Sequence, residues 1–160
     1  MILLAVDPSV RCTGYAVFKD GKVIRVGRIK PKSDGDDRYW EISNAIAEIL
    51  DQYSFDALAI ESQFVARVSR STLVLPEVKG IIKGTFFVKN QHGVVADITP
   101  MEAKKAIGIS KITKKDRKAY KEAAVAKVTE LFSFDEKIND DVADAIAIGV
   151  AFIKKLKKKL

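Results

Sequence analysis

Near its N-terminus the chain reads Ile2-Leu3-Leu4-Ala5-Val6-Asp7, five apolar residues that end on an acid. An apolar run of this length predicts a buried strand. A second run, Ala57-Leu58-Ala59-Ile60, also ends on an acid, Glu61. Acids are rarely placed at the ends of buried strands, because burying a charge is costly unless a partner neutralises it. These two strand ends are therefore the first candidates for a functional site.

The remaining pattern predicts an α/β fold. Asp20-Gly21, between two further strands, is a hairpin signal, so the chain begins with antiparallel strands. Pro76 is expected to open the second helix, since proline is tolerated at a first helical position. Thr99 and Glu102 form a capping box that starts a short helix. The predicted strands cover residues 2–7, 14–18, 22–29, 56–61 and 93–98, and the predicted helices cover 38–53, 76–90, 100–108, 113–132 and the stretch from 139 or 140 onward.

A helix separates the third and fourth predicted strands, so the chain has to cross over the sheet between them. Strands 2–7, 56–61 and 93–98 are therefore expected to be parallel. Parallel strands end at one edge, where open α/β sheets bind ligands, and Asp7 would stand beside Glu61 there. We expect one domain over residues 1–160, with a five-stranded mixed sheet, helices on both faces and a basic tail from about residue 154.

Charge and cysteine content narrow the class of protein. The 160 residues include 28 Lys and Arg against 21 Asp and Glu, a net charge of +7. This excess fits a polyanionic partner, although basic domains that bind no nucleic acid are common. Cys12 is the only cysteine, so we expect no internal disulfide and a cytoplasmic location. No stretch reaches the roughly 20 apolar residues of a membrane span, so no membrane partner is expected.

A second pair of acids lies near the C-terminus. Asp141 and Asp144 are three residues apart and would share one face of a helix. Acids in a first helical turn ordinarily complement the helix dipole, which explains Asp140 and Asp141. It explains Asp144 less well, because alanine and isoleucine surround that residue. Asp7, Glu61 and this pair would repel one another around one point. Divalent cations that prefer oxygen ligands, Mg²⁺ or Mn²⁺ rather than zinc, would relieve the repulsion.

Four segments carry a resemblance to a known family. They are Asp7 to Tyr15, Ile60 to Phe64, the helix with Gly80 and Gly84, and Asp141 to Ile148, and together they span nearly the whole chain. In this order they resemble the ribonuclease H-like nuclease superfamily and, within it, the RuvC-type Holliday junction resolvases. Ser9 departs from the glycine that usually follows Asp-Pro in the family, a change that removes no ligand.

The resemblance implies a fold, an activity and partners. The fold would be ribonuclease H-like, and the enzyme would resolve four-way DNA by paired symmetric nicks that leave 5′-phosphates. The catalytic and metal-binding residues would be Asp7, Glu61, Asp141 and Asp144, holding two Mg²⁺ ions per active site, with Mn²⁺ as a substitute. The helix with Gly80 and Gly84 would lie at the interface of a homodimer, and a branch-migration helicase would be a further candidate partner.

The resemblance also points to residues that would bind DNA. Phe64 stands in the position of the family's aromatic residue that stacks on opened junction bases, and a core phenylalanine is the alternative reading. Lys104 and Lys105 fit the family's DNA-contacting lysine to within one residue. Further candidate cations near these positions are Arg67, Arg70, Lys111, Lys114 and Lys115. Solvated helix faces often carry such charges, but cations at a helix N-terminus are disfavoured unless a phosphate binds there.

Each motif taken alone has a simpler explanation. Asp7-Pro8 also fits an ordinary turn, Glu61 could reach solvent, and Asp140 competes with Asp141 as the acid that acts with Asp144. Two other functions also remain open. One is a related nuclease for other branched DNA or for RNA, and the other is a junction-binding module without catalysis.

Overall fold

The structure is a computed structural model that describes residues 1–62, 70–109, 117–134 and 138–158. Strands and helices follow in the predicted order. They are β1 (Ile2–Asp7), β2 (Thr13–Lys19), β3 (Lys22–Ile29), α1 (Gly35–Leu50), β4 (Ala57–Glu61), α2 (Arg70–Lys89), β5 (Val94–Ile98), α3 (Pro100–Ala106), α4 (Arg117–Phe132) and α5 (Asp140–Lys157).

The strands form one mixed sheet in the order β3-β2-β1-β4-β5. β1 is antiparallel to β2 and parallel to β4, and β4 is parallel to β5, which confirms the predicted parallel set. Val6 pairs with Ile60 across β1 and β4. The next residue on each strand is an acid, so Asp7 and Glu61 reach the same edge of the sheet.

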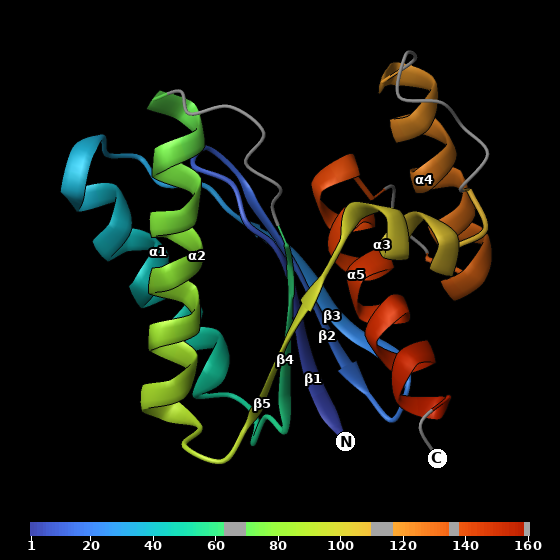
Figure 1. Ribbon diagram of the computed structural model, residues 1–160, viewed down its shortest axis with the longest axis horizontal. Helices are drawn as coiled ribbons and strands as arrows, with labels where there is room; N and C mark the ends of the chain where they lie inside the picture. Colours follow the sequence, from blue (N-terminus) through green and yellow to red (C-terminus); the bar gives the residue numbers. More distant parts are fainter. Residues whose placement is uncertain (63–69, 110–116, 135–137, 159–160) are drawn as a thin grey trace.

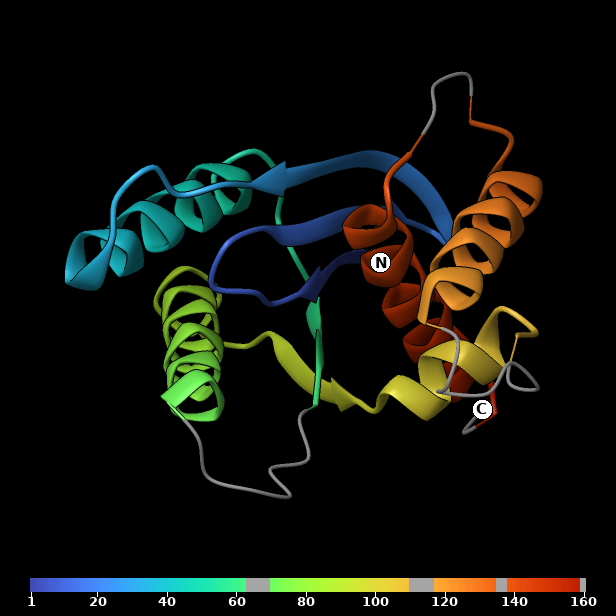
Figure 2. The same ribbon diagram turned by 90° about the horizontal axis from the view of Figure 1, so that it is seen from above.

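Helices cover both faces of the sheet. α1 and α2 lie on one face, and α3, α4 and α5 lie on the other, as Figure 1 shows from the side and Figure 2 shows from above. The side chains of β1 alternate between the two cores. Leu4 and Val6 pack with α1 and α2, whereas Leu3 and Ala5 pack with α3, α4 and α5. A strand with both faces buried needs an uninterrupted apolar sequence, which the N-terminal run provides.

The start of α2 differs from the sequence prediction. The helix begins at Arg70, so the prediction that Pro76 opens it is wrong, and Pro76 lies inside the helix. The proline ring removes one backbone hydrogen bond near the helix start. Val78, Ile82 and Phe86 on the same helix are fully buried in the core beneath it. This packing keeps the helix continuous despite the local penalty of proline.

The other predicted helix boundaries had mixed outcomes. α1 begins and ends three residues earlier than predicted, with Asp36 and Asp37 in its first turn, where acids complement the helix dipole. The predicted cap of α4 at Thr113 and Asp116 lies outside the described residues. The capping box of α3 and the Asn139 cap of α5 are both present.

Two glycines allow α5 to lie close against β2. A Cβ atom added to Gly14 would lie 2.1 Å from the carbonyl oxygen of Asp141, and one added to Gly149 would lie 2.2 Å from the ring of Phe18. Gly14 is also the strand partner of Asp7. The absence of a side chain at Gly14 therefore brings the first turn of α5 next to the end of β1.

The basic end of α5 contacts α3. Lys154 Nζ donates to the carbonyl oxygen of Ala106 at 2.7 Å, and Lys155 Nζ donates to Glu102 Oε1 at 2.7 Å. These two lysines, expected to begin a tail, are therefore part of α5 and hold α3 in place. None of the helices in the described ranges has both the length and the apolar character needed to cross a membrane.

Candidate active site

The four acids identified in the sequence lie around the edge where β1 and β4 end. Asp7 and Glu61 end neighbouring parallel strands. Asp141 lies in the first turn of α5, which packs against Gly14 beside Asp7. Asp144 follows within α5 and lines the same pocket as Glu61. Three segments that are far apart in the sequence thus bring their carboxylates to one region.

The pKa of Asp7 shows that the carboxylates lie close enough to repel one another. Burial raises the pKa of Asp7 well above its ordinary value of 3.8, and the charges of Glu61 and Asp144 raise it further. Hydrogen bonding with Glu61 also raises the pKa of Asp7, and it acts to lower the pKa of Glu61. Burial still raises the pKa of Glu61 overall. The charges of Lys104 and Lys79 act to lower the pKa of Glu61 but do not outweigh burial.

Asp144 is held by a tyrosine from α4. The Tyr120 hydroxyl donates to Asp144 Oδ1 at 3.1 Å. Burial raises the pKa of Asp144 to about 6, although the hydrogen bond from Tyr120 acts in the opposite direction. Burial and the charge of Asp144 raise the pKa of Tyr120, so its hydroxyl remains a neutral donor. No sequence motif identified Tyr120, because the contact joins residues 24 positions apart on two helices.

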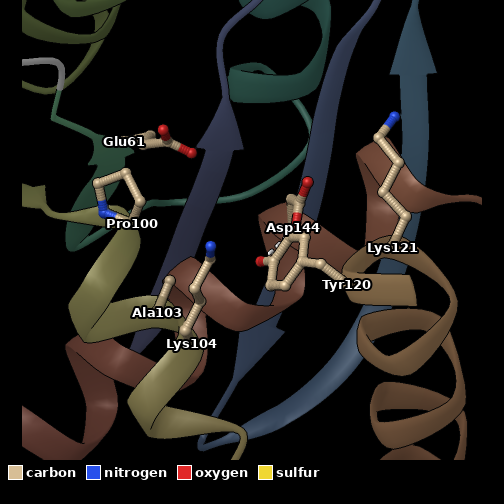
Figure 3. Close-up of a pocket in the computed structure, with 7 residues that line it drawn as sticks. All are labelled: Glu61, Pro100, Ala103, Lys104, Tyr120, Lys121 and Asp144. Carbon is tan, nitrogen blue, oxygen red and sulfur yellow. Dashed lines mark hydrogen bonds between the residues drawn. The ribbon is translucent and has the colours of Figure 1, made fainter. Parts of the chain in front are cut away.

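An open pocket of about 300 Å³ lies beside the acids (Figure 3). Lys104 extends from α3 between Glu61 and Tyr120, whereas Lys121 points away from them. Lys104 Nζ lies 3.9 Å from the centre of the Tyr120 ring, a cation–π contact. The residues that line the pocket are Glu61, Pro100, Ala103, Lys104, Tyr120, Lys121 and Asp144.

The two acids that begin α5 have different partners. Asp141 Oδ2 accepts a hydrogen bond from Cys12 Sγ at 3.0 Å. Burial, together with this hydrogen bond, raises the pKa of the Cys12 thiol to about 11, so the thiol is a protonated donor. Asp140 forms an ion pair with Lys121, whose hydrogen bond lowers the pKa of Asp140. Lys121 therefore neutralises Asp140, and no lysine or arginine within the described ranges forms such a pair with Asp141.

The donors at this edge have the chemistry of a site for hard cations. All four candidate ligands are carboxylates, which suit Mg²⁺ and Mn²⁺, and their mutual repulsion favours a bound cation. The described residues do not form a complete metal site in this conformation, because no three Asp, Glu, His or Cys side chains among them are placed to hold one ion. Asp141 and Asp144 instead accept hydrogen bonds from Cys12 and Tyr120.

Only part of the predicted DNA-binding set falls within the described residues. Lys104 lines the pocket and Lys105 is exposed on α3. Arg70 opens α2, but its side chain is not described. The predicted residues that lie outside the described ranges are Phe64, Arg67, Lys111, Lys114 and Lys115.

Known proteins match this chain over nearly its whole length. The sequence profile of the family "Crossover junction endodeoxyribonuclease RuvC" matches residues 3–152. A RuvC from Campylobacter jejuni is 30% identical over 166 residues, which cover 100% of each chain. T. thermophilus RuvC in complex with a Holliday junction substrate has a TM-score of 0.81 at 20% identity, covering 99% of this chain and 96% of that one. The fowlpox virus Holliday junction resolvase has a TM-score of 0.64 at 20% identity, covering 97% and 99%. These two structural likenesses concern the fold.

Proposed function

Because the chain belongs to the RuvC family of crossover junction endodeoxyribonucleases, we propose that it resolves four-way DNA junctions by nicking two opposed strands symmetrically and leaving 5′-phosphate ends. The observation that carries this proposal is that Asp7, Glu61, Asp141 and Asp144 gather at one edge of the sheet, where Glu61 and Asp144 line an open pocket. Relatives named for this activity match along the full chain. A branch-migration helicase remains a predicted partner.

A divalent metal is the cofactor that these residues fit. Asp7, Glu61, Asp141 and Asp144 would hold it, and two ions would balance four carboxylates better than one. Bound there, Mg²⁺ or Mn²⁺ would activate water for attack and stabilise the charge that develops on the phosphate. The elevated pKa values of Asp7 and Asp144 support this assignment, because a nearby cation would relieve both.

The side chains around the acids have their own roles in this proposal. Asp7 and Glu61, whose pKa values are both raised in the metal-free protein, would be ionised as ligands of the cation. Tyr120 would fix the orientation of Asp144 through its 3.1 Å hydrogen bond. Lys104, which rests on the Tyr120 ring, would contact a phosphate that enters the pocket.

Asp141 is preferred over Asp140 as the third acid. The charge of Asp141 acts on the pKa of Asp7, so the two carboxylates lie within electrostatic reach. Asp140 is bound to Lys121 instead. A carboxylate already neutralised by a lysine is a poorer metal ligand, because binding the ion would require breaking that pair.

The remaining DNA contacts are assigned from the sequence. Glu61 and Lys104 line the pocket. In the sequence, Phe64, Arg67 and Arg70 follow Glu61, and the remaining candidate lysines follow Lys104. Phe64 would stack on bases at the opened crossover, and cations would hold the backbone around it. The proposed backbone-binding residues are Arg67, Arg70, Lys104, Lys105, Lys111, Lys114 and Lys115.

A homodimer would place two such sites on the two strands that are cut. The outer face of α2 supports this arrangement, because Cβ atoms added to Gly80 and Gly84 would meet nothing within 4 Å. Phe87 and Val88 on the same helix are 48% and 78% exposed. We expect Val88→Glu to shift the protein from dimer to monomer in analytical ultracentrifugation. Trp40→Glu, which changes an apolar residue with 67% exposure on α1, should leave the dimer intact.

A synthetic four-way junction tests the activity directly. Each of the four strands is labelled in turn, and the junction is incubated with protein and Mg²⁺ beside a linear duplex of the same sequence. We expect two nicks at symmetric positions in the junction, which DNA ligase reseals because the ends carry 5′-phosphates, and no cutting of the duplex. Equal cutting of the two substrates would refute junction specificity. Binding of the junction without any cutting would point to the non-catalytic module.

A further inference from the structure

Two groups of cations among the described residues differ in their partners. On α2, Lys79 and Lys83 both bind Asp97, and Lys89 binds Asp51. In contrast, four cations near the end of β3 form no ion pair within the part of the chain that the structure describes. We call them the β3-side cations, and they are Arg11, Arg28, Lys30 and Lys32.

The β3-side cations lie at the same edge of the sheet as the candidate active site. β1 and β3 are both antiparallel to β2, so both end at this edge. Asp7 pairs with Gly14, and Gly14 pairs in turn with Arg28, which places the acid and the arginine in one row across the sheet. Lys30 and Lys32 follow β3 directly. Lys104 lies beyond β4, on the other side of Asp7, so cations flank the acids from both sides.

Two of these cations line a groove of about 460 Å³. Arg11 enters it from the loop between β1 and β2, and Lys32 enters it from the segment before α1. Val10 and Val74 also line the groove, as do Asp34 and Arg38, which pair with each other. Neither Arg11 nor Lys32 forms an ion pair with a residue that the structure describes, although the charge of Lys32 acts on Glu41 nearby.

Hydrogen bonds fix the backbone that carries both cations. The Thr13 hydroxyl donates to the carbonyl oxygen of Ser9 at 2.8 Å and accepts from its N–H at 3.1 Å, which closes the loop that holds Arg11. The backbone N–H of Lys32 donates to Glu41 Oε2 at 2.7 Å. Arg11 and Lys32 are themselves exposed. Because the backbone is already fixed, only the side chains of these two cations have to be ordered when they bind an anion.

We propose that the β3-side cations bind the backbone phosphates of the DNA arm that extends from the cut strand, away from Lys104. Arg11 and Lys32 bind phosphates of the DNA arm in the groove, while Arg28 and Lys30 bind further phosphates beside the end of β3. This inference rests on the proposed function, because it takes the DNA strand to cross the acids. Duplex backbone is the ligand that a row of unpaired cations at one edge recognises, since it presents regularly spaced phosphates.

The test compares two double variants that change the total charge equally. Arg11→Glu/Lys32→Glu alters the groove, and Lys22→Glu/Lys157→Glu alters exposed cations at the opposite end of the sheet (Figure 1). Each lowers the net charge from +7 to +3. The affinity for a fluorescent four-way junction is measured over a range of salt concentrations, with Ca²⁺ in place of Mg²⁺. Far-ultraviolet circular dichroism checks folding, and Arg11→Gln/Lys32→Gln serves as a milder second variant.

We expect the groove variant to bind the junction at least about 10-fold more weakly than the control variant. Its plot of log affinity against log salt should be shallower by about two, because each lost phosphate contact removes about 0.9 from the slope. The control should keep the wild-type slope and the wild-type cleavage pattern. Equal affinity and slope in the two variants would overturn the groove assignment while leaving the proposed function intact. Failure of wild-type protein to bind the junction would overturn both.

Discussion

Glu61 and Asp97 lie on neighbouring strands, one residue out of register, yet their surroundings are opposite. Ile60 of β4 pairs with Asp97 of β5. Burial alone would raise the pKa of Asp97, but hydrogen bonds from Lys79 and Lys83 outweigh it and hold the pKa below its ordinary value. Burial also raises the pKa of Glu61, and there the charge of Asp144 adds to it, while the charges of Lys104 and Lys79 do not outweigh the two effects.

Asp97 is therefore an acid that stabilises the fold, whereas the acids of the candidate active site destabilise it and have a proposed role in catalysis. The lysines of α2 neutralise Asp97, so the fold gains from its charge at neutral pH. Asp7, Glu61 and Asp144 repel one another in the metal-free protein, so the fold loses stability to keep them together. Proteins retain destabilising groups of this kind where catalysis or binding requires them.

The largest expected effect comes from changing one central acid to its amide. Asp7→Asn should reduce junction cleavage by about 10³-fold and leave binding in place. It should also raise the melting temperature of the metal-free protein at neutral pH, because it replaces a carboxyl whose ionisation is disfavoured by burial and by the neighbouring acids.

Asp97→Asn is the matched control. It should leave cleavage unchanged and lower the free energy of unfolding by less than about 1 kcal/mol, as expected for a partly exposed ion pair. Cleavage by the Asp7 variant at the wild-type rate would remove the distinction between the two acids.

The second prediction concerns the contact that brings α5 to the acids. Gly14→Ala should lower the free energy of unfolding by about 2–3 kcal/mol, because the new Cβ would overlap the backbone of Asp141. Cleavage should fall as well, since α5 carries Asp141 and Asp144. Chemical denaturation and a cleavage assay measure the two effects. Gly84→Ala is the control for the stability measurement alone, because its Cβ meets no atom of the chain within 4 Å but Gly84 lies on the proposed dimer face. A Gly14 variant with wild-type stability would show that α5 does not depend on this contact.

The third prediction concerns pH in the absence of metal. The pKa of Asp144 is about 6 in the folded protein against an ordinary value of 3.8, so the unfolded chain releases its proton first as pH rises. The stability from this group is therefore complete below pH 3.8 and is lost as pH rises through about 6, a change of about 3 kcal/mol.

Thermal denaturation from pH 4 to pH 7, with and without Mg²⁺, measures this loss. Mg²⁺ should restore the stability at the upper end of the range, since it binds the ionised carboxylates. Asp144→Asn should show a smaller loss in EDTA than the wild type. If the wild-type protein in EDTA instead gained stability over this pH range, the central acids would be compensated in the same way as Asp97.

The smallest expected effect comes from Tyr120→Phe, which removes the hydroxyl but keeps the ring that Lys104 contacts. We expect about 10-fold weaker Mg²⁺ binding by isothermal titration calorimetry and a similar fall in cleavage at limiting Mg²⁺. Tyr39→Phe is the control, because Tyr39 also hydrogen-bonds a carboxylate, Glu77, on the other side of the sheet. Identical Mg²⁺ affinities for the two variants would show that Tyr120 does not position Asp144.

The sequence predicted the strands and the parallel set because apolar runs and hairpin signals are local. It also placed Asp7 and Glu61 at one edge, since strand direction follows from the crossover connection. It gave the wrong start for α2, where packing of the later turns overrides the local effect of Pro76. The contacts of Tyr120 and Gly14 were not predicted, because each depends on how α4 or α5 packs after folding.

The lysines that join α5 to α3 connect the end of the chain to the pocket. Lys154 and Lys155 bind the last carbonyl and an acid of α3, and α3 carries Lys104. Acetylation of either lysine would remove its charge and weaken this attachment. A modification of residues that do not line the pocket would in this way shift α3, move the ammonium group of Lys104 and weaken its contact with DNA.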